Sequence, residues 1–142
     1  MDKIRVLIFA EHIAVRQSWQ SVLEANAESF NVIGLAQDYD EAAALLQLAP
    51  DVIVINWQLQ GTAAGSLANL VTERYTQTKA VIICMTDRPA VLQDILATGA
   101  AVILHRDITA ARFCEAVIKA NRGHRYNDII IADKSGILEK IP

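Results

Sequence analysis

The chain of 142 residues has 53% hydrophobic and 20% charged residues and a formal net charge of −3 at pH 7, which is typical of one compact globular domain. The negative charge and a pI near 5.5 exclude a basic field for phosphate backbones, so we expect no direct nucleic-acid binding by this chain. No apolar run reaches the roughly 20 residues that cross a bilayer, and the run near the N-terminus is too short for a signal peptide. We therefore expect no membrane contact and a cytoplasmic location.

Five apolar runs predict β-strands. Four of them lack alternation between polar and apolar residues, which indicates strands buried on both faces of a parallel sheet. The second run is less uniformly apolar and predicts a strand nearer the sheet edge. In chain order, the expected strands are 6–10, 31–36, 52–55, 80–85 and 101–104.

Helical spacing of apolar residues predicts helices between these strands. The last helix, about 109–122, ends before Gly123, which favours a helix stop. Alternating strands and helices predict an α/β fold, a doubly wound five-stranded parallel sheet in the order 2-1-3-4-5 with helices on both faces. The inward faces of the first, fourth and last helices are expected to carry Val15, Trp19, Val22, Leu23, Leu92, Ile95, Leu96, Phe113, Val117 and Ala120.

In this strand order the first and third strands flank the switch point where open α/β sheets place their chemistry. Ala10, Glu11 and Asn56 are therefore expected to converge at the carboxyl edge of the sheet, which is the edge where its parallel strands end. Thr86 and Arg106, at the ends of the fourth and fifth strands, are expected to line the same crevice. The loop after the first strand lacks the glycines and hydroxyls of a phosphate cradle, so we expect no flavin or nucleotide cofactor.

The remaining candidates for reactive chemistry have simpler structural explanations. His12, His105 and His124 have no metal-ligand spacing, so we expect exposed or structurally bonded histidines and no metal site. Cys84 lies in an apolar run and Cys114 in a helical pattern. This placement predicts two buried free thiols rather than a disulfide or a catalytic nucleophile.

Taken in order and spacing, five segments resemble the receiver domain of bacterial response regulators over about residues 3–126. The resemblance is to receivers that precede a LuxR-type helix-turn-helix, because Arg106 is followed by Asp107 and because the segment ends in RGHRY. The segments are IRVLIFAEHIAVRQSWQSVLE, NVIGLAQDYDEAAALL, PDVIVINWQLQG, VIICMTD and TGAAVILHRDITAARFCEAVIKANRGHRY.

Receivers carry an acidic pair after the first strand, a phosphorylated aspartate after the third, Ser or Thr after the fourth and lysine after the fifth. The resemblance places Ala10 and Glu11, then Asn56, Thr86 and Arg106 at these positions. Only one acid and the hydroxyl are retained. An Asn amide is a poor nucleophile and Mg²⁺ is bound through carboxylates, so the resemblance implies a degenerate site with no catalytic residue and no metal.

The resemblance also bears on switching. Ile103 stands at the aromatic switch position of the fifth strand, so the usual hydroxyl-to-aromatic coupling lacks its moving ring. We expect a standing ion pair between Glu11 and Arg106, with Asn56 either donating or accepting a hydrogen bond. The structural alternatives are that Asn56 caps its loop and that Thr86 bonds a neighbouring backbone group.

These features predict a signal-transduction module, related to two-component regulators, that acts without phosphorylation and through contact with a partner protein or a second copy. The alternative is a receiver that retains phosphate or small-ligand binding in the altered crevice; neither reading makes the chain an enzyme. The favoured contact lies on the last helix, where Arg112, Lys119 and Arg122 are expected to be exposed. Its structural alternative is a solvated charged face.

The expected organisation is a receiver-like domain over residues 1–126, followed by residues 127–142 as a tail or the start of a linker. A short helix in this tail, leading to an output domain, is one expectation. Two organisations stay open, a chain that stops at Pro142 and a longer one in which an output domain beyond Pro142 binds DNA and regulates transcription.

Overall fold

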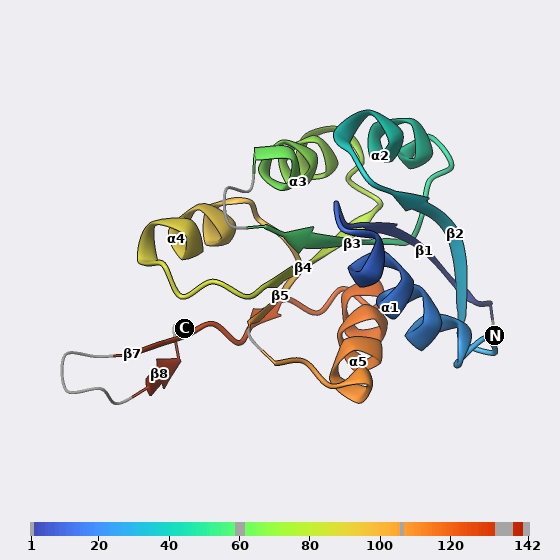
Figure 1. The fold of residues 1–142 in the computed structure, drawn as a ribbon. Helices are drawn as coiled ribbons and strands as arrows, with labels where there is room; N and C mark the ends of the chain where they lie inside the picture. Colours follow the sequence, from blue (N-terminus) through green and yellow to red (C-terminus); the bar gives the residue numbers. More distant parts are fainter. Residues whose placement is uncertain (1, 59–61, 106, 133–137, 141–142) are drawn as a thin grey trace.

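The computed structural model describes residues 2–58, 62–105, 107–132 and 138–140 (Figure 1). A six-stranded parallel sheet in the order β2-β1-β3-β4-β5-β6 forms its centre, and β7 and β8 form a separate antiparallel pair. Helices α1 and α5 cover one face of the sheet, and α2, α3 and α4 cover the other. The elements are β1 (Ile4–Phe9), α1 (Ile13–Glu24), β2 (Phe30–Ala36), α2 (Tyr39–Leu46), β3 (Val52–Trp57), α3 (Thr62–Arg74), β4 (Lys79–Cys84), α4 (Pro89–Ala97), β5 (Val102–His105), α5 (Ala110–Asn121), β6 (Tyr126–Asn127), β7 (Ile130–Ala132) and β8 (Leu138–Lys140).

The predicted α/β architecture with strand order 2-1-3-4-5 is confirmed, and a sixth strand extends it. The extra strand, β6, pairs in parallel with β5. It has only two residues, which is too short for hydrophobic periodicity to predict a strand. For the described residues of the tail the expected helix is wrong, because 130–132 and 138–140 form the strands β7 and β8. The β-branched run Ile129–Ile131 favours an extended backbone over a helix.

The core consists of two apolar clusters, one on each face of the sheet. The central strands β1, β3, β4 and β5 are buried almost throughout, as their uninterrupted apolar runs predict. On the α1 and α5 face, Phe113 and Val117 are fully buried, and the rings of Trp19 and Phe113 stack with centroids 4.3 Å apart. Gly123, with φ of +89°, ends α5 in the left-handed conformation that glycine favours. No helix within the described ranges has the length and apolarity needed to span a membrane.

Candidate functional site

The strand ends bring the expected site residues to one edge of the sheet. Ala10 directly follows β1, Asn56 is the last residue but one of β3, and Thr86 lies just beyond β4. Because Phe9 pairs with Ile55 across β1 and β3, Ala10 and Asn56 are neighbours at adjacent strand ends. Asn56 therefore lies inside its strand, one step further from the loop than the sequence predicts.

At the end of β1, the sheet edge has few exposed polar side chains. The methyl group of Ala10 is fully buried, whereas Glu11 is exposed. Arg16 of α1 donates from Nη1 to the carbonyl oxygens of Ala10 at 2.7 Å and Glu11 at 3.1 Å. An arginine thus holds the backbone of the loop after β1, and no sequence motif marks Arg16 for this role.

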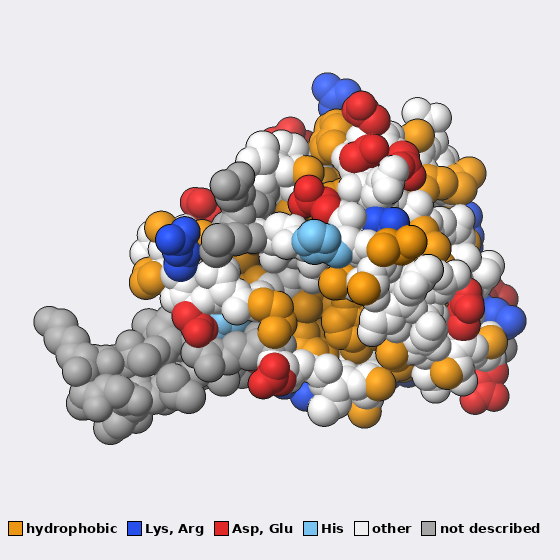
Figure 2. Space-filling view, in the orientation of Figure 1, with side chains coloured by type: hydrophobic (Ala, Val, Ile, Leu, Met, Phe, Trp, Pro, Cys, Tyr) orange, Lys and Arg blue, Asp and Glu red, His pale blue; other side chains and the backbone are white. Residues whose placement is uncertain are grey.

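Asn56 lies beside a pocket of about 390 Å³ between α1, the ends of β3 and β4, and the loop after β5. Asn56 itself is only 9% exposed. Figure 2 shows hydrophobic side chains gathered in the hollowed middle of this face. The apolar lining residues are Ala14, Val15, Trp19, Ile83, Met85 and Ile108, and the polar ones besides Asn56 are Ser18 and Asp107.

The donor groups at this edge do not match those that Mg²⁺ requires. Mg²⁺ is a hard cation that is bound through carboxylates and retains several waters. Ala10 offers a methyl group, Asn56 a neutral amide and Glu11 a single exposed carboxylate. Among the described residues, no group of three or more His, Cys, Asp or Glu side chains is placed to hold a metal ion.

On the β4 side, polar groups bond to one another. The hydroxyl of Thr86 accepts a hydrogen bond from the backbone N–H of Arg88 at 3.2 Å, which is the local backbone contact named above as its structural alternative. The buried ring of His105 reaches the same loop, with Nε2 2.7 Å from the Thr86 carbonyl oxygen and 3.1 Å from Oδ1 of Asp87. Since both neighbours are acceptors, the proton belongs on Nε2. His105 therefore joins the end of β5 to the loop after β4.

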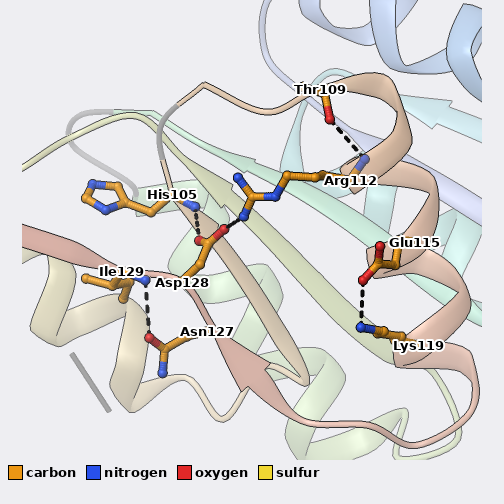
Figure 3. Close-up of polar contacts among 8 residues, drawn as sticks. All are labelled: His105, Thr109, Arg112, Glu115, Lys119, Asn127, Asp128 and Ile129. Carbon is orange, nitrogen blue, oxygen red and sulfur yellow. Dashed lines mark hydrogen bonds and ion pairs between the residues drawn. The ribbon is translucent and has the colours of Figure 1, made fainter. Parts of the chain in front are cut away.

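Asp128 joins the same end of β5 to α5 (Figure 3). Its Oδ1 accepts a hydrogen bond from the backbone N–H of His105 at 2.5 Å, and its Oδ2 forms an ion pair with the guanidinium of Arg112. Thr109 caps the start of α5 by accepting from the backbone N–H of Arg112 at 3.1 Å. The sequence does not predict this role of Asp128, because its partners are distant in the chain and no spacing rule links them.

The two remaining site residues predicted from the sequence are Ile103 and Arg106. Ile103 in β5 is 4% exposed and belongs to the apolar cluster that includes Leu92 and Ile95 of α4. Arg106 lies outside the described residues. The ion pair between Glu11 and Arg106 therefore stays a prediction.

Both cysteines are free thiols, as expected. Cys84 ends β4 with no exposure, and burial raises the pKa of its thiol to about 11. Cys114 is half-buried rather than buried, and burial raises its thiol pKa as well. A thiol that stays protonated at neutral pH is a poor nucleophile, so neither residue has the environment of a catalytic cysteine.

The doubly wound sheet with its crevice at the β1 and β3 switch point defines the class of receiver-type α/β folds. The family model of the response regulator receiver domain matches residues 6–118, and the chain belongs to this family. The probable transcriptional regulatory protein NarL of Mycobacterium tuberculosis is 29% identical over 126 residues, which cover 86% of this chain and 56% of NarL. The transcriptional regulatory protein LiaR of Bacillus subtilis is 26% identical over 132 residues, covering 92% of this chain and 62% of LiaR. The chain thus spans about half to two thirds of the length of these curated relatives.

Solved structures agree with this assignment. The receiver domain of the response regulator NarL from Mycobacterium tuberculosis superposes with a TM-score of 0.78 at 28% identity, covering 87% of this chain and 100% of that domain. The isolated receiver domain of RcsB from Salmonella enterica, determined with the phosphomimetic BeF₃⁻, has a TM-score of 0.76 at 18% identity and covers 89% and 94% of the two chains. The likeness to RcsB concerns the fold alone. The curated relatives NarL and LiaR are named transcriptional regulatory proteins.

Proposed function

We propose that this chain is a degenerate receiver that signals without phosphorylation, through contact with a partner protein or a second copy. The observation that carries the proposal is the pair of side chains at the β1 and β3 ends, a buried Ala10 methyl group and the amide of Asn56. Acceptance of a phosphoryl group requires an anionic oxygen, which an amide does not supply. With Ala10 and Asn56 at the β1 and β3 ends, Glu11 is the one carboxylate among the three residues there, which provides too little negative charge for a hydrated divalent cation.

The proposed contact surface consists of α4, β5 and α5. A ligand shifts a two-state equilibrium only through differential binding to the two states, so a receiver without phosphoryl input needs one standing arrangement of this surface. The packing of Ile103 against the α4 cluster supports such an arrangement. The cations Arg112 and Arg122 are exposed on α5, whereas Lys119 is half-buried.

Phosphoryl transfer provides the direct test. The chain is incubated with acetyl phosphate and Mg²⁺, and its intact mass is measured. We expect no phosphoryl adduct on the native chain and none on the Asn56→Asp variant, because Ala10 still withholds a metal-binding acid. The double variant Ala10→Asp/Asn56→Asp serves as the comparison that supplies both missing acids. A stable adduct on the native chain would overturn the proposal.

Association provides the second test. In sedimentation velocity runs with and without beryllofluoride and Mg²⁺, the association state is expected to be the same under both conditions. A monomer that dimerises only when the phosphoryl mimic is added would contradict phosphorylation-independent signalling.

The pocket beside Asn56 favours a second candidate function, the binding of a small apolar ligand in the altered crevice. Its apolar walls and few polar groups are typical of small-molecule sites. Titration with the neutral dye Nile red tests this candidate, with Ala14→Trp as the variant that fills the pocket. Saturable fluorescence that Ala14→Trp abolishes supports ligand binding, and fluorescence that the variant leaves unchanged excludes this pocket.

We also propose a domain organisation. A receiver-like domain covers residues 1–126, and its packing extends a little further, because Ile129 is fully buried. The residues after it are the start of a linker. The relatives are named transcriptional regulatory proteins and are longer than this chain, which supports an output domain beyond Pro142 that binds DNA. Expression of the natural gene product and measurement of its mass tests this organisation.

A further inference from the structure

We propose that Asp128 fastens the segment Tyr126–Ile129, here called the exit segment, to β5 and α5, so that the chain leaves the domain in a position set by these two elements. The inference goes beyond the proposed function and does not depend on it. It rests on three groups of contacts made by the exit segment.

Backbone pairing is the first group. The exit segment runs parallel to β5, with Tyr126 opposite Val102 and Asn127 opposite Ile103. The N–H of Tyr126 donates to the Ala101 carbonyl at 3.0 Å, and the N–H of Asp128 donates to the Ile103 carbonyl, also at 3.0 Å. The exit segment therefore covers the edge of β5 that would otherwise have unpaired backbone groups.

The Asp128 carboxylate is the second contact and links three parts of the fold (Figure 3). One oxygen accepts from the last residue of β5, His105, and the other pairs with Arg112 in the first turns of α5. The Asp128 side chain is only 14% exposed and its bond to the His105 N–H is partly shielded from water, whereas the Arg112 side chain is 46% exposed. Hydrogen bonds to charged groups stabilise more than neutral ones, and loss of this acceptor leaves a backbone N–H and a guanidinium without their partner.

Contacts on either side of Asp128 form the third group. Ile129 is fully buried in the apolar cluster on the α4 face, and its N–H donates to Oδ1 of Asn127 at 3.2 Å. On the other side, Nζ of Lys119 lies 5.4 Å from the centroid of the Tyr126 ring, a cation–π distance. Helical spacing predicted that Lys119 is exposed. It is half-buried instead, and its contact with the Tyr126 ring accounts for part of this burial. The exit segment is thus held at both ends, with Asp128 in the middle.

His105 extends the connection to the loop after β4. Its backbone N–H is bound by Asp128, while its ring Nε2 lies 2.7 Å from the Thr86 carbonyl oxygen. One residue therefore contacts the exit segment through its backbone and the Thr86 loop through its side chain. A displacement of β5 relative to α5 would therefore change both contacts of the Asp128 carboxylate, the one with the His105 N–H and the one with Arg112.

Hydrogen exchange at single amides, measured by NMR on the 142-residue chain, tests the proposal. In Asp128→Ala, we expect exchange at His105 and across 126–132 to rise by roughly tenfold or more, while the amides of β1 and β3 keep their protection. Arg112→Gln keeps the bond to His105 and removes the link to α5, so its increase is expected to be smaller and confined to 126–132. It also remains informative if Asp128→Ala does not fold.

The matched control is Glu24→Gln, which neutralises an exposed carboxylate at the end of α1 that accepts a hydrogen bond from Gln20 at 2.8 Å and has no contact with the exit segment. We expect exchange in the exit segment to be unchanged in this variant. Unchanged exchange at His105 and 126–132 in both Asp128→Ala and Arg112→Gln would overturn the proposal. An equal increase throughout the chain would also overturn it, because Asp128 would then stabilise the whole fold and not the exit segment in particular.

Discussion

The two sides of the carboxyl edge use polar groups differently. On the β1 and β3 side, Ala10 is a buried methyl group, and the Asn56 side chain makes no hydrogen bond to another described residue. On the β4 and β5 side, His105 and Asp128 each connect separate elements through hydrogen bonds of 2.5 to 2.7 Å. Side-chain contacts that connect separate elements at this edge are thus made by His105 and Asp128, on the β4 and β5 side. At this edge, the contacts of His105 and Asp128 therefore connect the end of β5 to the loop after β4 and to α5.

The largest effect is expected on stability, when one residue on each side of the edge is truncated to alanine. His105→Ala should lower the free energy of unfolding by about 2–4 kcal/mol, because it removes a fully buried ring and leaves the Thr86 carbonyl without its donor. Asn56→Ala should cost less than about 1 kcal/mol, since no partner is left unsatisfied. Urea unfolding of both variants measures the difference. Equal losses would remove the contrast between the two sides.

A second effect concerns Cys84, which ends β4 on the β4 and β5 side. Because burial raises its pKa from 9.0 to about 11, the folded state favours the neutral thiol. At pH 8, alkylation by iodoacetamide should be roughly a hundredfold slower than in urea, measured in a Cys114→Ser background. The same shift predicts stability that is fully present below pH 9 and is lost as the pH rises towards 11. Equal labelling rates in the folded and unfolded chains would show that Cys84 is accessible.

The smallest effect is expected at Glu115, on the exposed face of α5. The hydrogen bond from Lys119 lowers the pKa of Glu115, but the pair is exposed and screened by water. Glu115→Gln should leave the thermal midpoint unchanged within error, as followed by circular dichroism. A clear loss of stability would mean that this exposed ion pair on α5 contributes more than surface pairs ordinarily do.

The sequence predicts the strand order and the residues at the strand ends because both follow from long apolar runs. A run buried on both faces fixes a central strand, and its end fixes which residue reaches the crevice, as Ala10 and Thr86 illustrate. Asn56 is displaced by one step because β3 continues through Trp57, whose aromatic ring packs in the core like the apolar residues before it.

The contacts of Arg16, His105 and Asp128 could not be predicted in the same way. Each connects residues through loop geometry, which no local periodicity records. The two-residue strand β6 could not be predicted from the sequence either, because it is too short for a periodic pattern and forms only by pairing with β5. Side-chain contacts between separate parts of the chain and very short strands are therefore what the sequence patterns do not predict.

The central claim is that the β1 and β3 side cannot receive a phosphoryl group. Two-dimensional amide NMR spectra with and without beryllofluoride and Mg²⁺ test it most directly, because the mimic binds where a phosphoryl group would. We predict that the amide resonances of Asn56, Thr86 and Ile103 keep their positions when both reagents are added. A saturable, Mg²⁺-dependent shift of these resonances would contradict the claim.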